Sequence, residues 1–148
     1  MAASFESHNI ALIIDAPDDD IEMIGFPNEY SQVLLNLITN AKEAILTNGQ
    51  NGGHITVRLN RVDNFTQIVV SDNGGGIDEK ILDRLFEPYF STKESGSGIG
   101  LYMSKMIIEN SMNGKISVRN IPHGAEFTIS TPSNATLNTI IEKENQCE

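Results

Sequence analysis

The longest regular pattern in the chain is a stripe of apolar residues between positions 30 and 45. The stripe consists of Tyr30, Val33, Leu34, Leu37, Ile38, Ala41 and Ile45. Intervals of three, four and seven residues place these side chains on one face of an α-helix. Proline suits the first helical position, so we expect the helix to begin at Pro27. Asn48-Gly49 and Gly52-Gly53 follow the stripe and are expected to end the helix.

A second pattern, the alternation of apolar and polar side chains, predicts β-strands. It is clearest at residues 55–59, whose expected hairpin partner is 65–71 across an Asp63-Asn64 turn. A closing hairpin is expected from residues 115–120 and 125–131, around Pro122-His123-Gly124. The remaining expected elements are strands at 9–15 and 21–24 and helices at 78–86 and 100–110. Because these elements do not alternate as β-α-β units, we predict an α+β fold with helices on one face of a largely antiparallel sheet.

Two glycine runs interrupt this pattern. The first is Asp72-Asn73-Gly74-Gly75-Gly76 and the second is Gly96-Ser97-Gly98-Ile99-Gly100. Glycine lets a backbone approach a ligand closely, and a glycine-rich turn leading into a helix N-terminus is a typical anion site. The second run opens the predicted helix at 100–110. We therefore predict a nucleotide pocket with a mobile loop over the phosphates, although neither run fits the Walker A or the Gly-x-Gly-x-x-Gly pattern.

Polar residues beside the apolar stripe are candidate ligands. Gln32, Asn36 and Asn40 are spaced by four residues on the predicted helix. Asparagine is a poor residue for the middle of a helix. The amide oxygens either face the pocket, where one could bind Mg²⁺ together with phosphate oxygens, or belong to a solvated helix face.

The candidates outside this helix also have two readings. Asp72, at a predicted strand end, can accept a hydrogen bond from an exocyclic amine, or it merely initiates a turn. Lys93, ahead of the second glycine run, either reaches a phosphate or is an exposed loop lysine. His8, His54 and His123 share no metal-site spacing and are interpreted as structural or surface residues.

The amino-acid composition limits the classes of protein to which the chain can belong. The chain has 148 residues, 39% of them hydrophobic, which suits one globular domain. A net charge of −10 argues against nucleic-acid binding and favours a divalent cation beside an anionic nucleotide. The single Cys147 excludes an internal disulfide, and no apolar run approaches membrane-spanning length. We expect a cytoplasmic domain over residues 1–132 followed by a polar tail at 133–148, in a parent protein that could be membrane-anchored.

Together, five motifs resemble the boxes of the catalytic, ATP-binding domain of sensor histidine kinases, in the superfamily shared with gyrase, heat-shock chaperone and mismatch-repair ATPases. Residues 32–41 resemble the asparagine box, and Asp72-x-Gly74-x-Gly76 resembles the first glycine box. Residues 86–90 resemble the phenylalanine box, and Gly96 to Leu101 the second glycine box. Residues 124–127 are similar to a weaker last box. The match covers roughly residues 9–131, and the Phe-Ser-Thr-Lys order resembles the nitrogen-regulator-like subgroup.

The resemblance implies a two-layer sandwich of a mixed sheet and three helices that binds ATP and Mg²⁺. It implies that Asn40 binds the metal and Asp72 the adenine amino group. Asn36 replaces the glutamate that serves as general base in hydrolytic relatives, and an amide has no useful basicity. Many relatives carry a basic residue where this chain has Glu43, and the resemblance implies that Lys93 supplies that positive charge instead. The other nucleotide-site residues that it implies are Gly74, Gly76, Ile77, Phe86, Thr92, Gly96, Ser97, Gly98, Ile99, Gly100 and Leu101.

The resemblance also implies partners. The family's phosphoacceptor motif is absent around all three histidines, so the expected acceptor is a histidine on a separate helical-hairpin dimerisation domain. A response regulator and a homodimeric parent are expected. An anti-sigma-type serine kinase and a non-catalytic nucleotide-sensing module remain alternatives. Two departures are Phe26, where a helix-capping Asp is common, and Ala125, where a hydroxyl residue is common.

Overall fold

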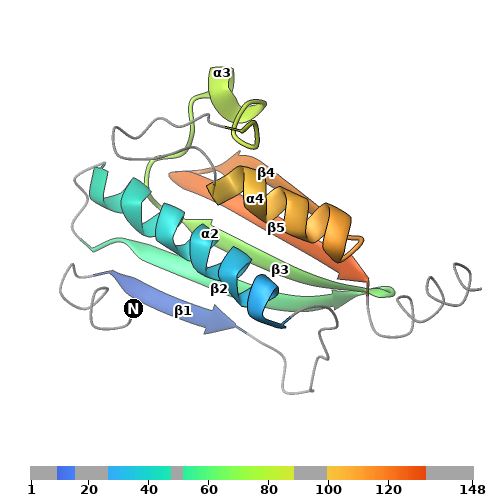
Figure 1. The fold of residues 1–148 in the computed structure, drawn as a ribbon. Helices are drawn as coiled ribbons and strands as arrows, with labels where there is room; N and C mark the ends of the chain where they lie inside the picture. The colour runs from blue at the N-terminus through green and yellow to red at the C-terminus, as the bar shows by residue number, and fades with distance from the viewer. Residues whose placement is uncertain (1–9, 16–26, 48–51, 89–99, 133–148) are drawn as a thin grey trace, which may run out of the picture.

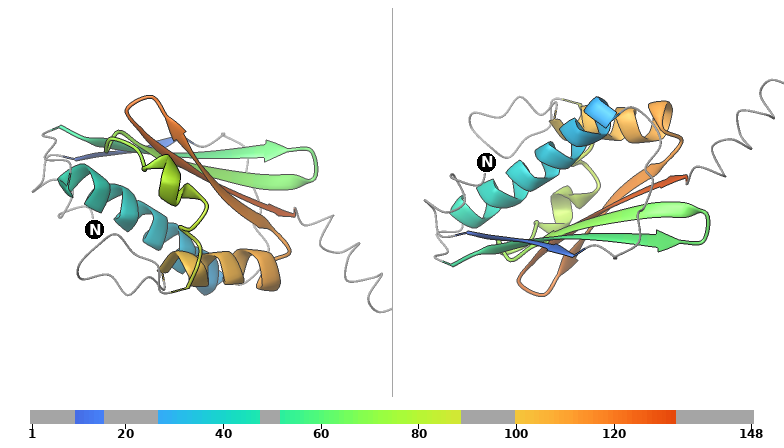
Figure 2. Two further views of the ribbon diagram at one scale, coloured as in Figure 1. Left: turned by 90° about the horizontal axis from the view of Figure 1, so that it is seen from above. Right: turned by 90° about the horizontal axis from the view of Figure 1, so that it is seen from below.

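The computed structural model describes residues 10–15, 27–47, 52–88 and 100–132. Within these ranges the chain forms a single five-stranded sheet in the order β1-β2-β3-β5-β4, with helices on one face (Figures 1 and 2). The strands are β1 (Ala11–Asp15), β2 (His54–Val62), β3 (Phe65–Asp72), β4 (Lys115–Ile121) and β5 (Gly124–Pro132). Only the β1–β2 pair is parallel, so the sheet is mixed and largely antiparallel, as predicted.

The long helix α2 (Pro27–Thr47) has the bounds that its apolar stripe and flanking residues predict. Leu37 and Ile45 are fully buried against the sheet. On the sheet side, Val57 lies opposite Val70, and Ile68 lies opposite Ile129. This single layer between helices and sheet is the core of the described residues.

The second helix on this face is α4 (Gly100–Met106), which continues as a π-helical turn at Ile107–Ser111. The predicted helix at 100–110 is therefore present, with a wider last segment that the sequence pattern did not indicate. Ile108 and Met112 are buried against the sheet. The Gly114 amide closes the segment by donating to the Ile108 carbonyl at 2.8 Å.

The helix predicted at 78–86 is wrong in length. The observed α3 (Glu79–Leu82) is one turn, capped by the Asp78 side chain, which accepts a hydrogen bond from the Lys80 amide at 3.0 Å. The following residues form turns instead, because Phe86 leaves the helical path to pack on the core. In Figure 1, α3 lies above the β4 edge of the sheet, whereas α2 and α4 cover its face.

Several predicted features lie outside the described residues. They are the strand at 21–24, the entry to α2 at Phe26, most of the loop between the glycine runs, and the tail at 133–148. The nucleotide-site residues in this group are Thr92, Lys93, Gly96, Ser97, Gly98 and Ile99.

Candidate functional site

Asp72 is the last residue of β3 and is only 6% exposed. Its carboxylate accepts a hydrogen bond from the Gly74 amide at 2.8 Å and another from the backbone of Ala125. Burial raises the pKa of this carboxyl above its ordinary value, although the two amide donors and nearby His54 oppose that rise. The structure thus holds a buried carboxylate at the strand end, oriented by main-chain donors.

The glycines after Asp72 fit closely against neighbouring elements. A β-carbon at position 74 would lie 2.9 Å from the backbone of Ala44, so the loop packs directly on α2. Gly76 has a φ of +83°, a conformation that other residues rarely adopt. Position 74 therefore needs glycine for the loop to approach α2 this closely.

The second glycine run ends against the same helix. The side-chain amide of Asn36 donates to Ser104 Oγ at 3.1 Å, and Ser104 Oγ donates to the Gly100 carbonyl at 2.9 Å. A β-carbon at position 100 would lie 2.8 Å from Oδ1 of Asn36. Asn36 therefore joins α2 to the first turn of α4, a contact that the sequence did not reveal.

Asn40 lies midway between these two contacts. Asn36, Asn40 and Ala44 are spaced by four residues and so lie on one face of α2. Gly100 packs on the first of them and Gly74 on the last, about 12 Å apart along the helix axis at the standard rise per residue. Asn40 is half-buried, whereas Gln32, one turn before Asn36, is exposed. The structure therefore brings the described ends of both glycine runs to a single helix face.

Phe86 anchors the start of the segment between the glycine runs. Its ring meets Phe127 of β5 edge-on, with centroids 6.3 Å apart and an interplanar angle of 85°. The ammonium of Lys105 on α4 lies 5.8 Å from the centroid of the Phe86 ring. Ile77 and Leu101, also predicted site residues, are partly buried against the core. The predicted phenylalanine box thus begins between β5 and α4.

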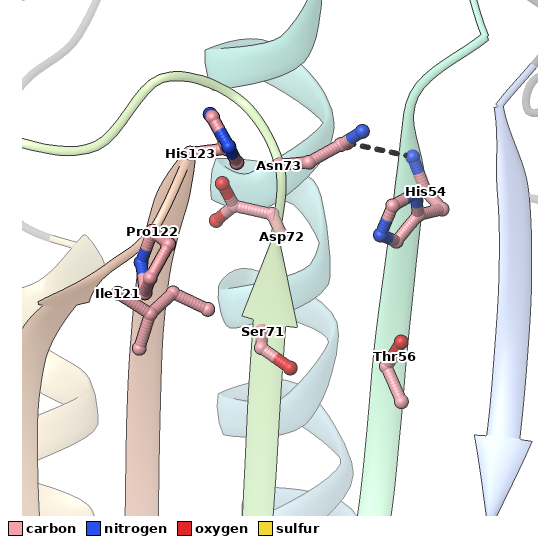
Figure 3. A pocket seen from close by; sticks show the side chains of 8 residues that line it. All are labelled: His54, Thr56, Ser71, Asp72, Asn73, Ile121, Pro122 and His123. Carbon is pink, nitrogen blue, oxygen red and sulfur yellow. Dashed lines mark hydrogen bonds between the residues drawn. The ribbon is translucent and has the colours of Figure 1, made fainter.

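The opposite face of the sheet carries a cavity of about 380 Å³ (Figure 3). Thr56 and Ser71 line it and alternate along their strands with buried Val57 and Val70, so the cavity lies away from the helices. It therefore differs from the α2 face that carries Asn40, although Asp72, at the end of β3, borders it. Its lining residues are His54, Thr56, Ser71, Asp72, Asn73, Ile121, Pro122 and His123.

This cavity brings together His54 and His123, which sequence analysis treated as unrelated. Asn73 Oδ1 accepts a hydrogen bond from the His54 amide at 2.8 Å, which ties the loop after β3 to the start of β2 (Figure 3). Among the described residues, no three His, Cys, Asp or Glu side chains gather as a metal site. No helix in the described part of the chain is long and apolar enough to cross a membrane.

Comparisons with known proteins identify the family of this chain. Residues 25–135 match the family model described as histidine kinase-, DNA gyrase B-, and HSP90-like ATPase. Relatives include sporulation kinase A of Bacillus subtilis, 39% identical over 115 residues, covering 77% of this chain and 18% of that protein. The two-component sensor PprA of Pseudomonas aeruginosa is 33% identical over 138 residues, covering 89% of this chain and 15% of that protein. The chain thus spans less than a fifth of either relative.

Solved structures show the same fold. The nucleotide-free catalytic domain of histidine kinase ThkA superposes with a TM-score of 0.81 at 28% identity, covering 89% of this chain and 84% of that domain. ThkA in complex with the response regulator TrrA superposes at 0.73 with 25% identity, covering 90% of this chain and 37% of that one. The chain therefore belongs to the histidine kinase-, DNA gyrase B- and HSP90-like ATPase family, as the ATPase catalytic domain of a sensor histidine kinase.

Proposed function

We propose that this domain binds ATP with Mg²⁺ and transfers the γ-phosphoryl group to a histidine on a separate helical-hairpin dimerisation domain. The observation that carries the proposal is the face of α2 where Gly100 packs on Asn36, Gly74 packs on Ala44, and Asn40 lies between. In this proposal the nucleotide lies along that face, with its base toward Gly74 and its phosphates toward Gly100. At both ends a glycine lets loop backbone approach α2 closely.

The residues have separate roles in this proposal. Asp72 accepts a hydrogen bond from the adenine amino group through a carboxylate that is already buried and oriented. Gly74, Gly76, Ile77, Phe86 and Leu101 surround the base side of the site. Asn40 supplies an amide oxygen to Mg²⁺, which needs few protein ligands because phosphate oxygens and water complete its shell. When bound, the cation neutralises charge on the phosphate oxygens.

The phosphate side depends on the second glycine run. Gly96, Ser97, Gly98, Ile99 and Gly100 are proposed to face the phosphates, with Thr92 and Lys93 ahead of them. Lys93 supplies the positive charge that many relatives have at the position of Glu43. Asn36 offers no basicity for activating water, and its amide is hydrogen-bonded to Ser104. Slow hydrolysis and retention of ATP for transfer follow from that arrangement.

We propose that residues 1–132 form this catalytic domain, with a polar tail at 133–148, on the cytoplasmic side of a homodimeric parent. The exposed side chains of Met103 and Met106 on α4 offer an apolar surface beside the site for the acceptor helices. A response regulator would then receive the phosphoryl group. The ThkA complex with a response regulator is a precedent within the family.

Radiolabelled ATP tests the reaction. The chain alone should bind ATP without labelling itself appreciably, and the mixture with the parent's helical-hairpin domain should give acid-labile phosphate on that partner. The yield should be low, because an untethered partner lacks the effective concentration, on the order of mM, of a short linker. Strong labelling of the chain alone would disprove a separate acceptor, and acid-stable phosphoserine would favour the anti-sigma-type kinase. Asn40→Ala is the inactive control.

A further inference from the structure

We infer that Asn120 is a positioning residue for the nucleotide base: its side-chain amide braces the glycine loop that leads away from Asp72. Asn120 lies near the end of β4, and no motif in the sequence singled it out. The inference deepens the proposed function, because it rests on the assignment of Asp72 to adenine. The loop concerned is residues 73–77.

The brace consists of two hydrogen bonds between one side chain and one backbone residue. The Ile77 amide donates to Oδ1 of Asn120 at 2.8 Å, and Nδ2 of Asn120 donates to the Ile77 carbonyl at 2.7 Å. Both backbone groups of Ile77 are therefore satisfied by a residue 43 positions away. Only a side-chain amide offers a donor and an acceptor in this arrangement; a carboxylate lacks the donor, and alanine lacks both.

The same hairpin holds the loop at a second point. The Gly75 amide donates to the carbonyl of His123 at 2.9 Å, in the turn between β4 and β5. Gly124 follows, and a β-carbon there would collide with the carbonyl of Asp72, so the turn lies directly against the end of β3. The β4–β5 hairpin thus contacts the loop at Gly75 and Ile77 and also contacts the strand that presents Asp72.

This loop needs external support because its own backbone is permissive. Gly75 and Gly76 have φ values of +96° and +83°, a region that glycine enters and leaves at little cost. A β-carbon at position 76 would lie 3.1 Å from Oδ1 of Asn120, so the glycine is also what lets the amide come close. Asn73 and Gly74 fix the start of the loop through hydrogen bonds with His54 and Asp72, whereas its second half is held by Asn120 and His123.

The position of the loop matters for the base rather than for the phosphates. Its first residues are tied to the Asp72 carboxylate through the Gly74 amide, and its last residue, Ile77, packs against the core. A loop released at Ile77 would leave Asp72 in place but free the backbone that lies beside the base. Because Asn120 itself is exposed, water can replace its partners, and the effect on global stability should be small.

The test measures ligand displacement and hydrogen exchange in four variants of the whole chain. Asn120→Ala removes both bonds and should weaken ADP binding about threefold to tenfold. Binding of magnesium tripolyphosphate, which has no base, should stay unchanged. Asn120→Asp keeps an acceptor for the Ile77 amide. In the ligand-free protein the Ile77 amide should therefore stay protected from exchange in Asn120→Asp and lose its protection only in Asn120→Ala. The affinity for each ligand is measured by its displacement of a fluorescent ATP analogue.

Arg119→Ala is the matched control, because it breaks the Arg119–Glu126 ion pair of 2.8 Å on the same hairpin without touching the brace. It should leave ADP affinity and Ile77 exchange as in the wild type. Equal losses for ADP and tripolyphosphate in Asn120→Ala would overturn the inference, as would unchanged ADP affinity. Asp72→Asn separates this inference from the proposed function. If Asp72→Asn leaves ADP affinity unchanged, while Asn120→Ala still speeds hydrogen exchange at the Ile77 amide, then the assignment of Asp72 to adenine is wrong but Asn120 does hold the loop.

Discussion

The amide of Asn36 and the backbone of Gly100 pack so closely that a side chain at position 100 would have to displace that amide. A β-carbon there would lie 2.8 Å from Asn36 Oδ1, while Asn36 Nδ2 donates to Ser104 and Ser104 donates to the Gly100 carbonyl. A glycine that the motif assigns to phosphate binding is thus also required for the packing of α4 on α2. The ligand site and the helix junction share this residue.

Gly100→Ala should therefore lower the free energy of unfolding by about 1–3 kcal/mol, the usual cost of overpacking. In the background of Asn36→Ala, the obstructing amide is gone and the same substitution should cost less. A double-mutant cycle from urea denaturation would measure this coupling, which we expect to be roughly 1 kcal/mol. Strictly additive effects would show that the two residues are independent.

The proposed adenine contact is tested by Asp72→Asn. The substitution keeps the size of the side chain but replaces a charged acceptor with an amide that can point a donor at the base amine. Hydrogen bonds to charged groups contribute roughly 1.5–3 kcal/mol, so ATP affinity should fall at least about tenfold with the fold intact. Calorimetry would measure the affinity, and an unchanged value would remove Asp72 from the base site.

The burial of the Asp72 carboxylate should also appear in how the stabilities of the wild type and of Asp72→Asn depend on pH. Because the pKa of Asp72 is raised in the folded state, the folded protein holds this proton at pH values where the unfolded chain has lost it. The contribution of Asp72 to stability is therefore full below the ordinary pKa of 3.8 and is lost as pH rises through the raised value. Urea denaturation across this window should show the wild type losing stability relative to Asp72→Asn. A pH-independent difference would contradict a raised pKa.

Much of the fold could be predicted because local signals and packing agree. Pro27, the apolar stripe and the glycines after Thr47 all indicate one helix, and its bounds are confirmed. The prediction failed at residues 78–86, where apolar spacing suits a helix but Phe86 packs instead between Phe127 and Lys105. These tertiary contacts override local propensity, and a single sequence does not display them.

In the candidate site, too, some residues could be predicted from the sequence and others could not. Asp72, Asn40 and the glycines belong to short motifs whose residues are close in sequence, so their spacing could be recognised. Ser104 and Asn120 could not be found, because Ser104 pairs with a residue 68 positions away and Asn120 with one 43 positions away. The one available signal for Asn120 was a polar side chain near the end of a strand whose buried positions are apolar.

Asn40→Ala separates metal binding from packing. If the amide oxygen binds Mg²⁺, its loss should weaken binding of Mg-ATP by at least about tenfold and weaken magnesium-free ATP much less. Calorimetric titrations with and without magnesium would measure both affinities. Gln32→Ala, an exposed position two turns earlier on α2, is the control and should change neither affinity. Equal losses for the two forms of ATP would mean that Asn40 only supports the helix face.

Tyr30 provides a test of the core that does not depend on the nucleotide. Its side chain is 4% exposed, and among the described residues its hydroxyl has no partner in hydrogen-bond geometry. Burial raises the pKa of this phenol from 10.0 to about 12, with the nearby Thr131 hydroxyl acting in the opposite direction. The folded protein thus keeps a hydroxyl that neither ionises readily nor makes a good hydrogen bond.

Tyr30→Phe should consequently raise the free energy of unfolding at neutral pH by about 1 kcal/mol, because an unpaired buried hydroxyl costs roughly 1–3 kcal/mol. The pH dependence should differ as well. A raised pKa in the folded state means that the wild type loses stability as pH rises from 10.0 through about 12, and the variant lacks this loss. Urea denaturation at pH values from neutral to alkaline would therefore show a growing advantage of the variant. A destabilised variant at neutral pH would instead reveal that the hydroxyl has a hydrogen-bond partner in solution.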